Sequence, residues 1–356
     1  MNTKYLVAIA DTHGNNEVLG KVSGQIRALL ERYHKPLDDC ALLYLGDALP
    51  SEKVEEKEVP GHYEKLTQAL ANAGLPVIGT GGSYDIEDAI RTAFEKKGWH
   101  FLHGETAEWN GLKFGGYGGS HLKPEAAEEE LGLSQEKFVQ FSEEDLAKKL
   151  GEAEIDIFLH HTMPYGFADN IGYRTVMTSE GPALAPVNIG AEAIHSILKK
   201  ANPILSICGH LHERTASTTV DRTVLIKCHG FERGERYSFP VYYVEIGYDH
   251  DGKPFVKSNV DINFIVDEGF AQLAPKPIVS CREEYEPNAE EMVHHYRIQK
   301  GEVDGLPVII KAIKTSEGKF KSISQAPALA GSDDISWAFA GDEKDEGVSE
   351  GGIILM

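Results

Sequence analysis

The sequence has few cysteines, no long apolar run and a shortage of basic residues. Its four cysteines, Cys40, Cys208, Cys228 and Cys281, are far apart, and no two form a C-x-x-C pair. This spacing argues against a disulfide framework or a cysteine metal site and favours buried thiols in a reducing compartment. The apolar run near the N-terminus is too short to cross a membrane, and no basic segment precedes it. We therefore expect a cytoplasmic protein with no membrane partner.

The shortage of basic residues limits the partners of the chain. Lysine and arginine total 35 against 56 aspartates and glutamates, which gives a formal net charge of −21 over 356 residues. Affinity for nucleic acid depends on basic side chains that displace counterions from phosphates, so direct binding of nucleic acid is not expected. Bound metal ions can invert the charge locally, however, and a site for phosphate esters stays open.

Apolar runs alternate with segments of helical period over about the first 250 residues. Buried strands are expected at 5–10, 40–45, 75–78, 99–102, 112–117, 155–159, 203–208, 224–227 and 241–246, and helices at 16–32, 63–73, 86–97 and 191–200. Asn110-Gly111 predicts a hairpin turn. Residues 122–150 are acidic with a helical pattern and predict a surface insertion, and the polar, Gly- and Pro-containing stretch 165–188 predicts a long loop. The alternation is typical of an α/β fold.

Carboxylates and imidazoles follow several of the predicted strands. They are Asp11, His13, Asp47, His161, His210 and His212. Open α/β sheets place ligands at the carboxyl ends of their strands, so these side chains are expected to meet. Imidazole with carboxylate suits Mn, Fe or Zn better than Mg or Ca. Six such ligands suit two ions that share a carboxylate, about 3.5–4 Å apart, with a bridging hydroxide as the nucleophile for phosphate ester hydrolysis.

The order of these motifs resembles that of the calcineurin-like metallophosphoesterases. Asp11-Thr12-His13, Gly46-Asp47, His161 and Gly209-His210-Leu211-His212 match the family's D-x-H, G-D, H and G-H-x-H in sequence order, and the resemblance covers roughly residues 5–248. It implies a four-layer α/β/β/α sandwich. It also implies one metal ion held by Asp11, His13, Asp47 and His212, and another held by Asp47, His161 and His210 together with the family's Asn.

The sequence departs from the family at the motif G-N-H-D/E. In the register that keeps Gly82 and Asp85, Ser83 stands at the Asn position and Tyr84 at the His position; in the alternative register Thr80 replaces Asn. We prefer the first, with Ser83 as a metal ligand and Tyr84 as the catalytic acid or hydrogen-bond donor toward the leaving group. A hydroxyl is a poorer neutral ligand than an amide oxygen, so the second ion is expected to bind more weakly.

Other histidines and arginines are weaker candidates. His121 competes with His161 for one ligand position, and the apolar strand before His160-His161 favours His161. His160 itself is expected to pack in the core or support its neighbour. Arg174, Arg214 and Arg233 could meet phosphate, but exposed surface positions are the better expectation.

These features predict a phosphoesterase domain at 1–248 and an extension at 249–356 that contains β strands, such as 253–266 and 308–313, and an acidic tail. The expected activity is hydrolysis of phosphate mono- or diesters, with a small-molecule or nucleotide ester as substrate. Two divalent ions are the expected cofactors, Mn²⁺ first, with Fe, Zn or Ni as alternatives. Two other functions stay open: a nuclease that works with a partner subunit, and a non-catalytic scaffold that lost activity with the Asn-His pair.

Overall fold

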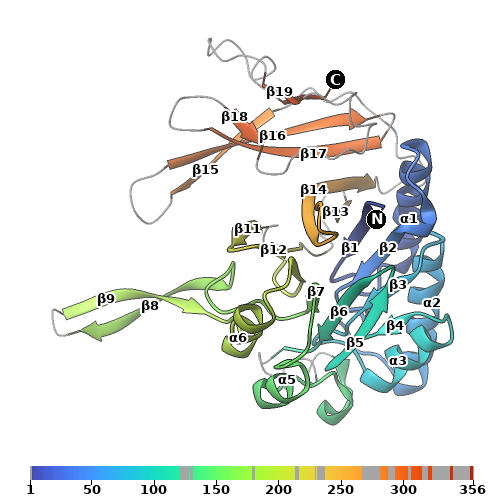
Figure 1. Ribbon diagram of the computed structural model, residues 1–356. Helices are drawn as coiled ribbons and strands as arrows, with labels where there is room; N and C mark the ends of the chain where they lie inside the picture. The colour runs from blue at the N-terminus through green and yellow to red at the C-terminus, as the bar shows by residue number, and fades with distance from the viewer. Residues whose placement is uncertain are drawn as a thin grey trace.

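The computed structural model contains two six-stranded mixed sheets packed face to face, with helices outside each sheet (Figure 1). It describes residues 2–120, 128, 131–178, 181–212, 216–228, 230 and 237–266, and the strand segments 281–287, 293–303, 306–314, 320–322, 337–339 and 353–355.

The first sheet is built around the N-terminal strand. Its order is β14-β13-β1-β2-β3-β4; β1 to β4 run parallel, and β13 joins β1 antiparallel. The strands are β1 (Lys4–Ile9), β2 (Cys40–Tyr44), β3 (Val77–Gly79), β4 (His100–Phe101), β13 (Tyr237–Tyr248) and β14 (Pro254–Val266). Its covering helices are α1 (Asn16–Arg32), α2 (Val59–Ala71) and α3 (Glu87–Glu95).

The second sheet has the order β11-β12-β10-β7-β6-β5, with four parallel central strands and an antiparallel strand at each edge. The strands are β5 (Glu105–Trp109), β6 (Leu112–Tyr117), β7 (Ile157–His160), β10 (Leu205–Cys208), β11 (Ala216–Val220) and β12 (Thr223–Lys227). Helices α5 (Glu143–Leu150) and α6 (Glu192–Ala201) cover it, and single 3₁₀ turns occupy Leu37–Asp39, Glu56–Glu58 and Gln135–Lys137.

Three apolar clusters hold these layers together. One packs α1, α2 and α3 on the first sheet, with Leu19, Tyr63 and Phe94 fully buried. A second fills the space between the sheets, and a third joins α5 and α6 to the second sheet. Alternate residues of one strand serve different clusters, as Val7 and Ala8 do, because side chains alternate across a strand. The predicted four-layer sandwich is confirmed.

The prediction of a long loop at 165–188 is wrong. This stretch contains an antiparallel hairpin of β8 (Asn170–Thr178) and β9 (Gly181–Asn188), which projects from the body of the molecule (Figure 1). Its glycines and prolines are residues that usually mark loops, and its strand segments show no clear apolar alternation, so the sequence indicates a loop. The hairpin turn at Asn110-Gly111 is confirmed: both residues have positive φ, 50° and 80°, as a tight turn between β5 and β6 requires.

The region beyond residue 249 contains strands, as expected. β14 completes the edge of the first sheet, so the predicted strand at 253–266 belongs to the sandwich. The later strands are β15 (Cys281–Pro287), β16 (Val293–Val303), β17 (Leu306–Lys314), β18 (Phe320–Ser322), β19 (Trp337–Phe339) and β20 (Ile353–Leu355). A boundary between two domains at 248 stays a prediction. Among the described residues, every helix is too short or too polar to span a membrane.

Candidate metal centre

The site forms where parallel strands of both sheets end. Asp11 follows β1, Asp47 follows β2, His161 follows β7, and His210 and His212 follow β10. Four of the site residues, Asp11, His13, Asp47 and His210, have positive φ between 41° and 78°. Such backbone is strained for residues with a side chain and tends to gather at functional sites. The sharp turns aim the side chains of both sheets at one place.

Two glycines let the strand ends approach closely. A Cβ atom at Gly82 would lie 2.1 Å from the Asp47 Oδ1 atom, and one at Gly209 would lie 2.6 Å from Asp11 Oδ2. Both distances are far below van der Waals contact, so any larger residue would displace a carboxylate. The glycines of the G-x-x-D and G-H-x-H segments therefore serve the site directly.

One group of side chains is partly open to solvent. We call Asp11, His13 and His212 the outer triad; one ligand atom of each lies within 4.8 Å of the others. His13 Nε2 is 3.1 Å from His212 Nε2, and His212 Nε2 is 3.7 Å from Asp11 Oδ1. Asp11 is fully buried, whereas the His212 side chain is 41% exposed. The outer triad thus presents nitrogen atoms and one oxygen at a surface that a ligand can reach.

A second group lies deeper. Asp47, His161 and His210 form the inner triad, again with ligand atoms within 4.8 Å of one another. His161 Nε2 is 3.2 Å from Asp47 Oδ2 and 3.2 Å from His210 Nδ1. The backbone amide of His210 donates to Asp11, with 3.1 Å to each carboxylate oxygen. That amide therefore ties the two triads together.

Asp47 lies between the triads. Its Oδ2 atom is also 3.9 Å from His13 Nε2 of the outer triad. Its Oδ1 atom accepts a hydrogen bond from the Tyr84 backbone amide at 2.8 Å. One carboxylate oxygen therefore faces ligand atoms of both groups.

The charges of the inner triad favour an anionic Asp47. Burial alone would raise the pKa of Asp47, but His161 holds it well below its usual range by charge and by hydrogen bonding. Burial alone would likewise lower the pKa of His161, and Asp47 instead raises it to about 9. Burial, together with the charge of His161, lowers the pKa of His210 to about 3. Without a metal ion, a proton on His161 thus supplies the positive charge that the buried carboxylate needs.

Asp85 holds the backbone turn that carries Asp47 through hydrogen bonds. Its carboxylate accepts hydrogen bonds from the backbone amides of Asp47, Ala48 and Gly82, at 2.8, 3.0 and 2.8 Å. The Tyr63 hydroxyl of α2 donates to it at 3.1 Å. Burial, and then the charge of Asp47, raises the pKa of Asp85 to about 6. Asp85 thus fixes the positive-φ turn that carries Asp47.

Ser83 and Tyr84 both reach the site. The Ser83 hydroxyl lies 3.5 Å from Asp47 Oδ2, and the Tyr84 ring meets the His13 ring edge-on at 5.5 Å. Thr80 is fully buried, and its Oγ1 atom makes no hydrogen bond. This placement supports the register that keeps Gly82 and Asp85, with Ser83 beside the inner triad and Tyr84 beside the outer one.

The other candidates lie elsewhere or outside the described residues. His160 is buried with both ring nitrogens occupied, by the Thr162 carbonyl oxygen at 2.6 Å and the Ser206 hydroxyl at 2.7 Å, as expected for a supporting residue. His121, Arg214 and Arg233 lie outside the described residues, and Arg174 lies on β8. Sequence reasoning missed Ser120, whose hydroxyl lies 3.0 Å from His210 Nε2.

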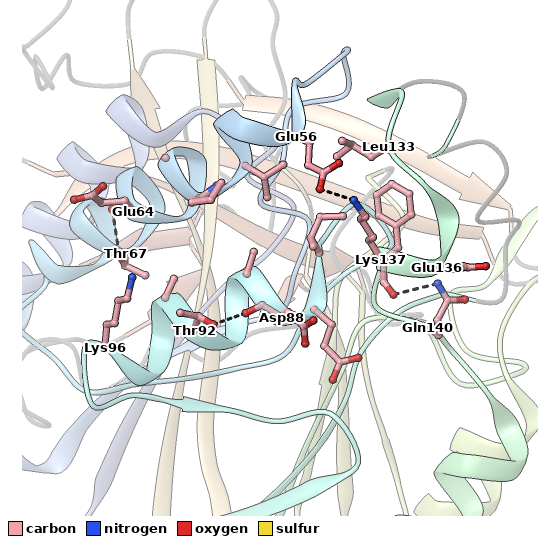
Figure 2. A pocket seen from close by; sticks show the side chains of 18 of the residues that line it. Glu56, Glu64, Thr67, Asp88, Thr92, Lys96, Leu133, Glu136, Lys137 and Gln140 are labelled. Atoms are coloured by element: carbon pink, nitrogen blue, oxygen red, sulfur yellow. Dashed lines mark hydrogen bonds and ion pairs between the residues drawn. The ribbon is translucent and has the colours of Figure 1, made fainter.

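Two other places could be mistaken for the site. Asp249, His250 and Asp251 form a third cluster of ligand types, but all three are exposed on one turn. A broad hollow of about 1020 Å³ lies between α2, α3 and residues 133–140 (Figure 2). Its rim carries polar side chains that bond one another, such as Lys137 with Glu56, and none of the predicted site residues lines it.

The donor set fits two divalent cations. Each triad offers one carboxylate and two imidazoles, the ligand types of Mn, Fe and Zn. The pKa of Asp47 lies well below its usual range, so its carboxylate is anionic and suits a cation. The residues present thus match the expectation of a dinuclear centre, and they leave the identity of the metal open.

Solved structures of two phosphatases are similar to this chain. A dimetal phosphatase from Danio rerio is 13% identical and covers 73% of this chain and 98% of its own, with a TM-score of 0.43. The purple acid phosphatase PPD1 from yellow lupin seeds is also 13% identical and covers 76% of this chain and 52% of its own, with a TM-score of 0.35. No curated protein matches the chain.

The family itself is identified by sequence. Residues 5–214, more than half of the chain, match the sequence model of the calcineurin-like phosphoesterases. The match begins in β1 and extends past the G-H-x-H segment, so it includes every residue of both triads. The resemblance inferred from the motif order is confirmed, and the chain belongs to the calcineurin-like phosphoesterase family.

Proposed function

We propose that this chain hydrolyses phosphate esters with two divalent cations, one held by the outer triad and one by the inner triad. The observation that carries the proposal is the position of Asp47 Oδ2, 3.2 Å from His161 Nε2 and 3.9 Å from His13 Nε2. A single carboxylate oxygen that faces both triads is what a pair of neighbouring cations requires. Such a pair supplies an activated water and neutralises the charge of the phosphoryl group.

The protein's own residues divide the remaining tasks. The exposed side of His212 gives an ester access to the outer triad, and the buried side of the site excludes water from Asp47 and His161. The Tyr84 ring contacts the His13 ring, and the Tyr84 hydroxyl is the group proposed to donate a proton to the leaving oxygen. Ser83 is the proposed neutral ligand of the inner ion, in place of the family's Asn.

The proposed substrate is a small-molecule or nucleotide phosphate ester. The net charge of −21 opposes binding of a long polyanion, whereas a small ester meets mainly the local charge of the metal centre. Mn²⁺ is the proposed metal because it accepts the mixture of carboxylate, imidazole and hydroxyl ligands. Both monoesters and diesters fit this chemistry.

The proposal is tested by metal analysis together with turnover of bis-p-nitrophenyl phosphate and p-nitrophenyl phosphate in Mn²⁺. We expect two ions per chain and hydrolysis of at least one ester. Asp47→Asn should lower turnover on the order of 10³-fold, since it removes the shared anionic ligand. Asp39→Asn is the matched control, because Asp39 pairs with Lys4 away from the site and its loss should leave turnover unchanged.

Two outcomes contradict the proposal. Turnover that survives in Asp47→Asn would place the chemistry elsewhere. A folded wild-type protein with one ion or none, inactive on both esters, would favour the non-catalytic scaffold, in which Ser83 and Tyr84 mark the lost activity. Salt-sensitive binding of DNA by the isolated chain would instead favour a nuclease.

A further inference from the structure

Ser120 touches the metal centre but belongs to none of the motifs that define it. It follows β6 in the segment Gly118-Gly119-Ser120, and it is 5% exposed. Its hydroxyl oxygen lies 3.0 Å from Nε2 of His210, a residue 90 positions later in the chain. The other ring nitrogen of His210, Nδ1, faces His161 Nε2 in the inner triad at 3.2 Å. His210 is therefore held between Ser120 and the centre.

The segment before Ser120 is fixed by three other parts of the fold. The Gly118 amide donates to His103 Nδ1 at 3.1 Å, and the Gly119 amide donates to the Gly81 carbonyl oxygen at 3.0 Å. The Thr162 hydroxyl, next to His161, donates to the Gly119 carbonyl oxygen at 2.9 Å. These bonds connect Ser120 to the ends of β3 and β7, so its position is set by the same strand ends that carry the site.

The two glycines are needed for this placement. A Cβ atom at Gly118 would lie 2.3 Å from the Gly81 carbonyl oxygen. At Gly119, φ is +77°, and a Cβ atom would lie 2.5 Å from the Val139 carbonyl oxygen. Both are backbone contacts that cannot move aside easily. The sequence thus uses two residues without side chains to bring one hydroxyl to His210.

A neutral imidazole carries a hydrogen on one nitrogen and a lone pair on the other. Nδ1 of His210 can bind a cation only when the hydrogen is on Nε2, and the atom next to Nε2 is the Ser120 oxygen. We propose that Ser120 is a positioning residue: its hydroxyl oxygen accepts a hydrogen bond from the Nε2–H group of His210 and so leaves Nδ1 free to face the inner cation. This inference rests on the proposed function, because it requires a cation at the inner triad.

A second serine–histidine pair in the same sheet provides a matched control. The Ser206 hydroxyl lies 2.7 Å from His160 Nε2, and both residues are buried. The other ring nitrogen of His160 bonds to the Thr162 carbonyl oxygen. Both nitrogens of His160 are therefore hydrogen-bonded within the protein, and neither can bind a cation. Removing the Ser206 hydroxyl should therefore affect stability alone.

The test compares Ser120→Ala, Ser120→Thr and Ser206→Ala with the wild type. Mn²⁺ affinity is measured by competition with a chelator, and the tautomer of His210 by ¹⁵N imidazole signals of the metal-free protein. We expect Ser120→Ala to weaken the affinity of one of the two sites by about 10–100-fold and to give a mixture of His210 tautomers. Ser120→Thr keeps the hydroxyl and should stay near the wild type, and Ser206→Ala should keep wild-type affinity.

Three results overturn the inference. The first is wild-type affinity and an unchanged tautomer in Ser120→Ala. The second is a loss of affinity that Ser206→Ala shows to the same degree, which would reflect general loosening of the sheet. The third is a mixed tautomer in the wild type. A wild-type chain that binds no Mn²⁺ but shows a single Nε2–H tautomer would instead refute the proposed function and keep the Ser120–His210 hydrogen bond.

Discussion

The outer and inner triads contain the same ligand types but occupy different surroundings. In the outer triad the His13 and His212 side chains are 13% and 41% exposed, whereas in the inner triad His161 is fully buried. Rings in both triads have their second nitrogen occupied, so this feature does not separate them. In the inner triad, His161 Nδ1 contacts the Leu45 carbonyl oxygen and His210 Nε2 contacts Ser120. In the outer triad, His13 Nδ1 contacts the Ser51 hydroxyl and the Leu49 carbonyl oxygen. The difference is one of exposure. Under the proposed function, the inner triad would hold a buried ion and the outer triad an ion that the substrate can reach.

The largest expected effects come from removing one histidine of each triad, and the stability of the metal-free fold should distinguish the two variants. His161→Ala and His212→Ala should each lower turnover on the order of 10³-fold, because each removes a ligand of the dinuclear centre. Only His161→Ala should also destabilise the metal-free fold, by about 3–5 kcal/mol, since it leaves the buried Asp47 without its charged partner. Urea unfolding in EDTA measures this difference, and equal losses in the two variants would refute the distinction between the triads.

Much of this comparison can be predicted from the sequence, because each triad residue follows a strand and strand ends of a parallel sheet converge. Asp11, Asp47 and His210 are found in this way, and the motif order supplies the family. The sequence does not show which triad is buried, since depth depends on contacts between distant segments. The role of Ser120 cannot be predicted from the sequence for the same reason. No local pattern relates Ser120 to His210, and only the packing of β6 against the other strand ends brings the two residues together.

The hairpin of β8 and β9 shows a different limit of prediction from the sequence. Its glycines and prolines are the residues that usually mark loops, and its strands lack the apolar alternation that would indicate a half-buried sheet. At the Asn-His positions, by contrast, the pattern is informative. The backbone amide of Tyr84 donates a hydrogen bond to Asp47 Oδ1, a contact that does not depend on the side chain at position 84. This backbone contact favours the register with Ser83 at the Asn position, which residue types alone leave open.

A smaller effect tests the outer side of the comparison. Tyr84→Phe removes the proposed proton donor beside His13 and keeps the ring contact. Turnover of an alkyl phosphate ester, whose leaving group needs a proton, should fall by about 10²-fold. Turnover of the p-nitrophenyl ester should change little, because that leaving group departs as a stable anion, and metal content should be unchanged. An equal loss for both esters would contradict the acid role and indicate that Tyr84 only shapes the site.

The last effect is on stability alone and concerns two adjacent histidines, of which only His161 belongs to a triad. Burial lowers the pKa of His160 to about 4, below the usual value of about 6.5, so unfolding at pH 4 to 6.5 takes up a proton at His160. The native state should therefore lose stability as pH falls through this window, by about 3 kcal/mol from this residue. His160→Gln should show a flatter dependence than the wild type in urea unfolding with EDTA at pH 4.5 and 7. Parallel curves would mean that His160 titrates normally, and hence that it does not share the burial of the inner triad.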